Sequence, residues 1–420
     1  MHHFSYSDGA LCCEGVPLAE IAEAVGTPCY VYSTATLERH VRVIADAVSD
    51  INCLIAYSVK ANGNLAVLAT LAAKGAGADV VSGGELLRAR RAGIPASRIV
   101  FSGVGKTAAE MELGLREGIH QFNVESLSEL HVLSSVAERL GKTAPVAMRV
   151  NPDVAAGGHP NISTGKAGDK FGVAWADVEA IYDEAGELPG IDALGVDVHI
   201  GSQIGALEPM RAAFEKTIDL AKRLRTRGHD IRRVDLGGGL GVPYRPEDEP
   251  ASPAAYAQMI REVIGDFDVE LVLEPGRVIA ANAGVMLTRA LYLKDAPDRT
   301  FLIVDAGMND LMRPALYGAH HEIWPVQATD AAPSRAYDVV GPICESTDKF
   351  ATARALAPIV EGDLLAIMSS GAYGAVLSSQ YNARPLVPEV LVRDGDWRTI
   401  RRRPTFEEMI ELEELPDWLT

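Results

Sequence analysis

A single lysine, Lys60, closely follows a short apolar stretch, Cys53–Ala56. A lysine at the carboxyl end of a buried strand points into a site, where burial lowers the pKa of its amine and makes the amine nucleophilic. Such an amine can form a Schiff base with an aldehyde cofactor. Most lysines are simply solvated, so Lys60 taken alone favours a surface position, and the other polar clusters must decide.

Two further polar residues, His199 and Glu274, also follow apolar stretches. A carboxylate held against a pyridine nitrogen keeps the ring protonated and makes it a strong electron sink. A charge-assisted hydrogen bond of that kind contributes roughly 1.5–3 kcal/mol. The flat imidazole of His199 could stack on such a ring, with an ordinary core histidine as the alternative. Arg277, three residues after Glu274, offers a fork for a carboxylate.

The glycine run Gly237–Gly241 could bind a phosphate, because backbone N–H groups without Cβ atoms can approach an anion closely. In parallel barrels the phosphate site often follows strands seven and eight. The run does not match the dinucleotide fingerprint, whose third glycine would fall at Val242. Gly105–Thr107 resembles a P-loop, but Val100 replaces the required upstream glycine. Both nucleotide-binding interpretations are therefore rejected, and a plain glycine-rich turn is the alternative for the run by itself.

The elements that must position these clusters are short apolar strands that alternate with helices between residues 50 and 275. About eight strands, each followed by a helix, predict a closed parallel (β/α)8 barrel, with a doubly wound open sheet as the alternative. The clusters then follow the first, sixth, seventh and eighth strands and meet on one face of the barrel. The predicted strands are 53–58, 78–81, 99–102, 121–124, 146–150, 193–199, 233–236 and 271–274.

After about residue 280 the alternation stops, and strands are predicted near 290–293, 300–305, 336–340 and 388–392 without regular helices between them. These strands indicate a second, mostly β domain with sandwich-like or barrel-like character. The early strand Cys29–Tyr32 precedes the first barrel strand and can return to this domain. We therefore expect a barrel over residues 34–280 and a β domain made of residues 1–33 and 281–420.

Composition limits the class of protein. The chain has 420 residues, 48% of them hydrophobic and 23% charged, which is typical of a globular protein with two domains. A net charge of −18 without a basic run excludes a nucleic-acid binder. Five cysteines without a Cys-x-x-Cys pair predict no disulfide framework and no metal site. With no signal peptide and no membrane-spanning run, the expected location is the cytoplasm.

These motifs resemble the fold-type III pyridoxal-phosphate-dependent decarboxylases, and the resemblance runs nearly end to end. It implies the cofactor pyridoxal 5'-phosphate, with Lys60 forming the Schiff base, His199 stacking on the ring and Glu274 pairing with the pyridinium. The matching segments are Tyr57–Asn62, Gly77–Glu85, His199–Gln203, Gly237–Tyr244, Glu274–Arg277, Met312–Tyr317, Gly341–Ser346 and Gly371–Gly374. The cofactor-binding residues implied are Lys60, His199, Ser202, Gly237, Gly238, Gly239, Gly241, Glu274, Gly276, Arg277 and Tyr373.

The resemblance also implies that Cys344 is the proton donor, reaching the site from the partner subunit of a homodimer with shared active sites. Without the motif, a small buried hydrophobic residue would be the commoner fate of a free cysteine. The β domain would contribute to the active site and to the dimer interface. The segment His159–Lys166 resembles the mobile active-site loop of the family.

Substrate choice is expected to depend on Glu345, because relatives that act on ornithine carry the shorter Asp there. Glu345 resembles the form that binds the distal amino group of meso-2,6-diaminopimelate, which would be decarboxylated to L-lysine and CO2 as the last step of lysine biosynthesis. A substrate that lacked the second carboxylate would leave buried guanidinium groups unpaired and be rejected. The substrate-binding residues implied are Arg277, Arg313, Tyr317, Glu345 and Tyr373.

Three other functions fit parts of the pattern. A racemase on the same barrel usually pairs the pyridine nitrogen with arginine, and Glu274 argues against it. A non-catalytic regulator that binds a partner protein tends to lose the Schiff-base lysine or the donor cysteine, whereas both Lys60 and Cys344 are present. A decarboxylase of a tethered amino acid is disfavoured because Arg277 and Arg313 are both retained.

Overall fold

The computed structural model of the chain describes residues 2–155, 165 and 168–419. The predicted active-site loop, His159–Lys166, lies outside the described residues apart from Gly165. The chain divides into two compact units, Leu37–Ile279 and Met1–Thr36 with Ala280–Thr420. In the part of the chain that the structure describes, no helix is long and apolar enough to cross a bilayer.

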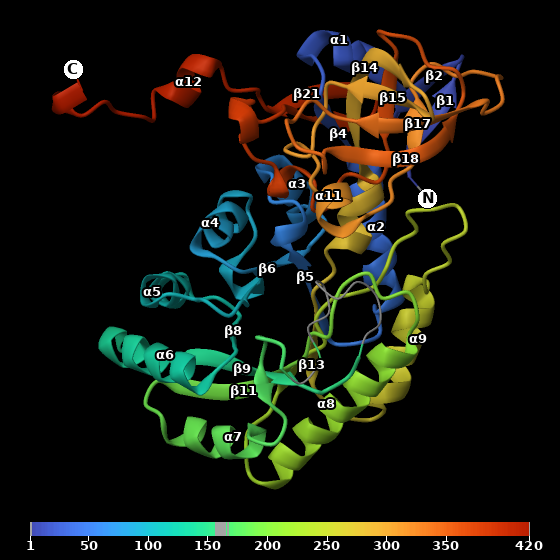
Figure 1. Cartoon of the computed structure of the whole chain (residues 1–420). Helices are drawn as coiled ribbons and strands as arrows, with labels where there is room; N and C mark the ends of the chain where they lie inside the picture. Colours follow the sequence, from blue (N-terminus) through green and yellow to red (C-terminus); the bar gives the residue numbers. More distant parts are fainter. Residues whose placement is uncertain (1, 156–164, 166–167, 420) are drawn as a thin grey trace. The chain divides into compact units, whose positions relative to one another are not determined.

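The unit Leu37–Ile279 is a closed (β/α)8 barrel, which confirms the predicted fold class (Figure 1). Eight parallel strands follow one another around the barrel in chain order, and the circle closes where the first pairs with the eighth, Cys53 opposite Leu271. The barrel strands are β5 (Cys53–Ser58), β6 (Gly77–Val80), β7 (Ile99–Phe101), β8 (Gln121–Val124), β9 (Ala144–Asn151), β11 (Ile191–Asp197), β12 (Arg233–Asp235) and β13 (Glu270–Leu273); a short β10 (Val173–Ala174) adds to β9.

Helices lie outside the strands of the barrel, as Figure 1 shows for α4 to α8. Their ends follow local signals: Thr107 and Glu110 form a capping box at the start of α5, and Gly118 ends it in the left-handed conformation. At the start of α6 the Ser126 hydroxyl caps the helix by accepting from the Glu129 N–H. The helices are α2 (Thr34–Ala47), α3 (Leu65–Ala72), α4 (Gly83–Arg91), α5 (Ala108–Glu117), α6 (Leu127–Leu140), α7 (Val178–Glu187), α8 (Glu208–Thr226), α9 (Pro253–Ile264) and α10 (Arg277–Ala280).

The sixth barrel strand begins and ends two residues earlier than predicted. β11 ends at Asp197, whose ladder partner is Asp235, so the prediction that this strand reaches His199 is wrong. Beyond Asp197 the chain turns toward the residues that follow β12, where the Gly238 N–H donates to the His199 ring. His199 therefore lies in the loop after its strand and not on the strand.

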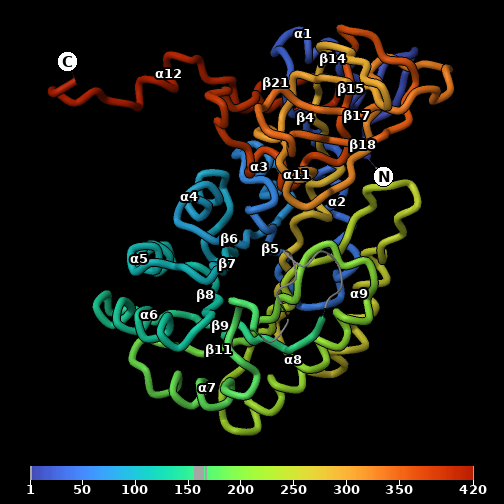
Figure 2. The backbone as a smooth tube through the Cα atoms, in the orientation of Figure 1, coloured from blue at the N-terminus to red at the C-terminus, as the bar shows by residue number. Residues whose placement is uncertain are grey.

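The second unit is mostly β, as predicted, and is built around the long strand β14. The early strand β4 runs antiparallel to β14 and parallel to β20, so it returns to this domain as expected. Figure 2 shows the blue β4 beside the later strands of this unit. The strands are β1 (Phe4–Ser7), β2 (Ala10–Cys13), β3 (Val16–Pro17), β4 (Cys29–Ser33), β14 (Gly284–Ala296), β15 (Arg299–Val304), β16 (Ile323–Pro325), β17 (Arg335–Val340), β18 (Lys349–Leu356), β19 (Leu364–Ile367), β20 (Glu389–Arg393) and β21 (Asp396–Arg401); the helices are α1 (Leu18–Val25), α11 (Arg313–Tyr317) and α12 (Phe406–Ile410).

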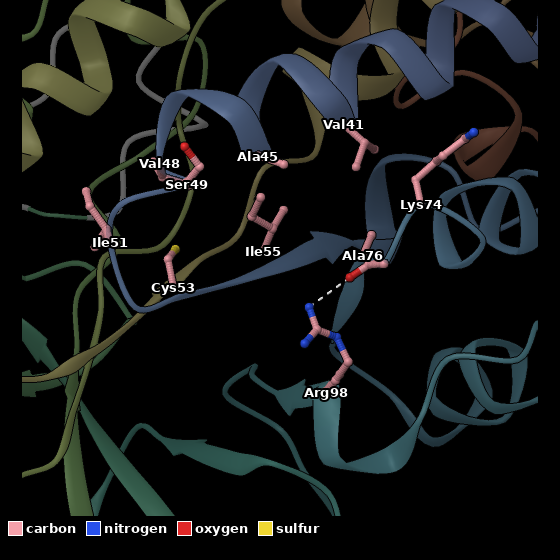
Figure 3. A pocket seen from close by; sticks show the side chains of 11 residues that line it. Val41, Ala45, Val48, Ser49, Ile51, Cys53, Ile55, Lys74, Ala76 and Arg98 are labelled. Atoms are coloured by element: carbon pink, nitrogen blue, oxygen red, sulfur yellow. Dashed lines mark hydrogen bonds between the residues drawn. The ribbon is translucent and has the colours of Figure 1, made fainter.

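A cavity of about 230 Å³ lies at the amino ends of the first barrel strands. Figure 3 shows Val41 and Ala45 of α2 above Ile55 of β5, with Cys53 and Arg98 nearby. Cys53 is the first residue of β5, whereas the predicted chemistry follows the carboxyl end of that strand. This cavity is therefore separate from the candidate site.

Candidate active site

Lys60 lies in a short 3-10 turn, Val59–Ala61, directly after β5. Its Nζ is 2.8 Å from the Asp79 carboxylate on the neighbouring strand β6, and Asp79 is fully buried. The Ser58 hydroxyl donates to the same carboxylate oxygen over 3.0 Å. The structure thus places an amine at the carboxyl ends of the strands, as predicted, and holds it there with a buried carboxylate that was not among the predicted site residues.

The His199 imidazole is neutral in this structure. Its Nδ1 accepts a hydrogen bond from the Gly238 N–H at 3.2 Å, which leaves the ring proton on Nε2. Burial, together with the nearby cations Arg149 and Lys60, holds the pKa of His199 well below its usual value. A neutral, oriented ring presents an aromatic face without a competing positive charge.

Glu274 follows β13 and is buried among other acids. Its Oε1 lies 3.3 Å from the Ser102 hydroxyl and 3.3 Å from the Asn123 amide, and both groups can donate to it. Burial raises the pKa of Glu274 well above its usual value, and the carboxylates of Asp235, Asp79 and Asp197 raise it further.

The acids around Glu274 form a buried acidic cluster, which we define as Asp79, Asp197, Asp235 and Glu274. Burial likewise raises the pKa values of Asp197 and Asp235. Among the described residues, Asp79 Oδ1 and Asp197 Oδ1 are buried without a hydrogen-bond partner. A cation brought into this cluster would relieve both the desolvation and the mutual repulsion of these carboxylates.

The glycine run after β12 is a tight turn that only glycine can form. A Cβ on Gly238 would lie 2.3 Å from the Glu274 carbonyl oxygen, and one on Gly237 would lie 2.7 Å from His199 Nδ1. Gly237 and Gly239 also have positive φ angles, +63° and +112°. The Asp235 carboxylate accepts from the Gly237 N–H at 2.9 Å and fixes the start of the turn. These contacts fix the shape of the turn, and phosphate binding by its N–H groups stays a prediction.

A cationic side chain lies close to Ser202 in the same unit. The buried Arg277 donates from Nη2 to the Ser202 hydroxyl at 3.1 Å and from Nη1 to the Tyr244 hydroxyl at 2.9 Å. Gly276 precedes it, and a Cβ there would come within 2.9 Å of the Ser58 Cβ. Arg277, Ser202 and the glycine turn together supply charged and neutral donors of the kind that bind a phosphate.

The remaining predicted residues lie in the β unit. Arg313 and Tyr317 begin and end the short helix α11, and Arg313 is buried. Tyr373 has a positive φ of 54°. The structure therefore brings together the predicted barrel residues Lys60, His199, Ser202, Gly237, Gly238, Gly239, Gly241, Glu274, Gly276 and Arg277, and it places Arg313, Tyr317, Cys344, Glu345 and Tyr373 in the other unit.

Cys344 and Glu345 stand on an exposed stretch of that unit. Cys344 is exposed, so the alternative of a small buried hydrophobic residue is wrong. The Cys344 N–H donates to the Asn382 side chain at 3.1 Å. The Glu345 carboxylate accepts from the Thr347 hydroxyl at 2.6 Å, and this bond, followed by one from Tyr381, lowers the pKa of Glu345.

The buried acidic cluster is the part of the site that the sequence interpretation missed. Asp79, Asp197 and Asp235 each stand within or at the end of an apolar barrel strand. A charged residue in a strand that is otherwise buried on both faces is the signal that could have found them.

The residues present fit pyridoxal 5'-phosphate. An amine is available for its aldehyde, a neutral imidazole for its ring, and a tight glycine turn with Arg277 for its phosphate. The orphaned oxygens of the buried acidic cluster fit a protonated pyridine ring. Among residues 2–155, 165 and 168–419 no cluster of His, Cys, Asp and Glu could hold a metal ion.

Comparison with known proteins agrees with this chemistry. Residues 34–281 match the pyridoxal-binding domain of the pyridoxal-dependent decarboxylases. Diaminopimelate decarboxylase of Pseudomonas aeruginosa is 52% identical over 415 residues, 99% of each chain, and that of Zymomonas mobilis is 47% identical over 99% of each chain.

Solved structures give the same result. The crystal structure of M. jannaschii diaminopimelate decarboxylase in complex with L-lysine matches with a TM-score of 0.95 at 36% identity and full coverage of both chains. The Helicobacter pylori enzyme, also with L-lysine, matches with a TM-score of 0.90 at 40% identity over 94% of this chain and 98% of that one. The chain belongs to the pyridoxal-dependent decarboxylases and, among them, to the diaminopimelate decarboxylase family.

Proposed function

We propose that this chain decarboxylates meso-2,6-diaminopimelate to L-lysine and CO2 with pyridoxal 5'-phosphate, the last step of lysine biosynthesis. The observation that carries the proposal is the convergence of Lys60, neutral His199 and buried Glu274 at the carboxyl ends of the barrel strands. Relatives of 44–52% identity over nearly the whole chain are diaminopimelate decarboxylases, which supports the substrate.

Different residues would hold the aldehyde, the ring and the phosphate of the cofactor. Lys60 would bind its aldehyde, His199 would stack on its ring, and Glu274 would pair with the ring nitrogen. Ser202, Arg277 and the N–H groups of Gly237–Gly241 would bind its phosphate, with Tyr373 reaching it from the β unit. The bound cofactor supplies an electron sink for the pair of electrons that CO2 leaves behind.

The chain's own groups do the remaining work. Asp79 holds the Lys60 ammonium at 2.8 Å and so would keep this amine near the strand ends whenever it is not bound to the cofactor. The acids around Glu274 favour a positive charge beside it and so would keep the ring nitrogen of the cofactor protonated. The Cys344 thiol would donate the proton that replaces the lost carboxylate on the substrate carbon.

Substrate selection would rest on the β unit. Arg313 and Tyr317 would bind a substrate carboxylate, with Arg277 as a further guanidinium, and Glu345 would bind the distal ammonium group. A monocarboxylate such as lysine or ornithine would leave a buried guanidinium unpaired. Sites built to bind a polar group reject analogues that lack it by large factors.

We also propose a cytoplasmic homodimer in which the β unit of one subunit completes the active site of the other. The exposure of Cys344 supports this assembly, because a proton donor on an exposed stretch needs a covering surface to exclude water. A barrel over residues 34–280 and a β domain of residues 1–33 and 281–420 remain our proposed boundaries for the two roles.

The test is to incubate purified protein with pyridoxal phosphate and meso-diaminopimelate and to measure lysine and CO2. Stoichiometric lysine and CO2 are expected. Turnover of ornithine or lysine without turnover of diaminopimelate would overturn the substrate, and racemisation without CO2 would replace the reaction by that of a racemase.

A matched pair of variants tests the cofactor assignment. Lys60→Ala is expected to abolish the visible absorbance of the bound cofactor, because the covalent link to the amine is lost. Lys74→Ala is the control, since Lys74 is a surface lysine 41% exposed in the same unit and paired with Glu38. Absorbance that persisted in Lys60→Ala would show that another lysine carries the cofactor.

A further inference from the structure

We propose that His321, which no motif singled out, is the positioning residue that holds Arg313 for the substrate carboxylate. The inference rests on the proposed function in one respect, the assignment of Arg313 to a substrate carboxylate. Both side chains are buried, His321 with 1% and Arg313 with 5% of its surface exposed. Arg313 Nη1 lies 2.9 Å from His321 Nε2.

The backbone around His321 is fixed by a pair of strands. His321 leads into β16, which runs antiparallel to β19, and Met368 directly follows β19. The Met368 N–H donates to the Glu322 carbonyl at 2.8 Å and continues this pairing. The Met368 carbonyl is thereby placed 2.8 Å from His321 Nδ1.

These two partners decide the protonation of the ring. A carbonyl can only accept, so His321 Nδ1 must carry a proton and donate to Met368. A guanidinium can only donate, so His321 Nε2 must present its lone pair to Arg313. The ring is therefore neutral and in a single tautomer, and a second proton on Nε2 would set an N–H against the N–H of Arg313.

The backbone carbonyl of His321 is held as well. Arg354 donates from Nη1 to this carbonyl at 3.0 Å, and its Nη2 lies 3.0 Å from the ring of His320. The imidazole is thus anchored through its backbone, through Nδ1 and by burial before it meets Arg313. A rigid acceptor of this kind restricts the rotation of the long Arg313 side chain before substrate arrives. Substrate binding then costs less side-chain conformational entropy.

The contact with His321 fixes the orientation of the Arg313 guanidinium. Nη1 is engaged by His321, which orients the plane of the guanidinium. A carboxylate prefers an arginine fork presented edge-on at a fixed angle. His321 would therefore act on the affinity for the substrate and not on the transfer of the proton, because it acts only through Arg313.

Two conservative substitutions separate the contacts of the ring. In His321→Gln the side-chain oxygen can reach the position of Nε2 and still accept from Arg313. In His321→Asn the side-chain amide can replace Nδ1 and donate to Met368, but it is too short to reach Arg313. We expect KM for meso-diaminopimelate to rise about tenfold in His321→Asn with little change in kcat, and to rise much less in His321→Gln.

The readout distinguishes positioning from folding. Thermal unfolding of both variants is measured alongside, and equal KM values in the two variants would overturn the proposal. In an Arg313→Met background, His321→Asn is expected to have no further effect on KM, because the path through Arg313 is gone. A full tenfold effect in that background would show that His321 acts elsewhere.

The same series separates this inference from the proposed function. If Arg313→Met leaves KM unchanged, the assignment of Arg313 to a substrate carboxylate is wrong, whatever His321 does. If Arg313→Met raises KM strongly while His321→Asn does not, the proposed function stands and the positioning role of His321 falls.

Discussion

At the scale of single residues, Glu85 shows how the acids near Lys60 depend on pH. Its carboxylate accepts from the Val81 N–H at 2.8 Å, close to the start of α4. Burial raises the pKa of Glu85 to about 7 from its usual 4.5, with the Asp79 charge adding to the rise. The folded state therefore binds a proton that the unfolded state releases between these two pH values.

The sign of the effect follows directly. The stabilising contribution of Glu85 is complete below pH 4.5 and is lost as pH rises toward 7, by about 3 kcal/mol at most. In the cofactor-free protein, Glu85→Gln is expected to reduce the fall in unfolding free energy between pH 5 and 8, because a Gln side chain does not titrate. The Gln oxygen can still accept from the Val81 N–H, so the local hydrogen bond is retained. Chemical denaturation at the two pH values measures this difference.

The control for this experiment is Glu112, whose pKa is shifted in the opposite direction. The guanidinium groups of Arg139 and then Arg116 lower the pKa of the Glu112 carboxylate, which is partly exposed. Its contribution is lost only as pH falls below 4.5, so Glu112→Gln is expected to leave the difference between pH 5 and 8 unchanged. An unchanged pH dependence in Glu85→Gln would contradict the raised pKa.

The proposed proton donor, Cys344, gives a second prediction at this scale. Cys344→Ala is expected to leave the absorbance of the bound cofactor intact and to slow turnover by roughly 10²- to 10⁴-fold, the usual contribution of a positioned acid. Cys53→Ser is the control, because Cys53 is the other cysteine that is not fully buried and lies at the amino end of β5. Normal turnover in Cys344→Ala would remove this thiol from the reaction.

At the scale of secondary structure, the sequence predicts the elements whose ends carry local signals. The bounds of β5 and β8 agree residue for residue with the predictions. A strand such as β8, which is buried at every position, can be recognised in the sequence as a short stretch between two helices. Helix starts are set by caps such as Thr107, which involve only neighbouring residues.

What could not be predicted depends on contacts between distant segments. Asp79 and Asp235 come together in the buried acidic cluster because the barrel closes, and neither strand alone predicts this. The pair of His321 and Arg313 likewise depends on the pairing of β16 with β19, more than 40 residues later in the chain. Local patterns carry no information about such partners.

The glycine turn after β12 gives a prediction at the scale of an element. In Gly238→Ala the new Cβ would lie 2.3 Å from the Glu274 carbonyl oxygen, which is backbone and cannot turn aside. The turn and the end of β13 must separate, at a cost of about 1–3 kcal/mol. We expect a lower Tm and at least tenfold weaker binding of pyridoxal phosphate, measured by titration of the cofactor-free protein.

Gly105→Ala is the matched control for this turn. A Cβ at Gly105 would meet no heavy atom within 4 Å, so its Tm and cofactor affinity should match those of the parent protein. Equal cofactor affinity in the Gly238 and Gly105 variants would show that the turn does not bind the phosphate.

At the scale of the whole molecule, the chain builds its β unit from both ends and its barrel from the middle. β4 lies between β14 and β20, which follow it by more than 250 residues. The barrel contains the proposed cofactor-binding residues other than Tyr373, which lies in the β unit with Cys344 and Glu345. The proposed homodimer would join the barrel of one copy to the β unit of the other.

This arrangement predicts complementation between two inactive variants. A mixed dimer of Lys60→Ala and Cys344→Ala copies has one site without either native residue and one site with both. Random exchange at equal concentrations makes half of the dimers mixed, so activity should recover to about a quarter of the parent value. Differently tagged copies verify the exchange by native mass spectrometry. If mixed dimers form and activity stays at the level of the separate variants, Lys60 and Cys344 act within one chain, and the shared-site dimer is wrong.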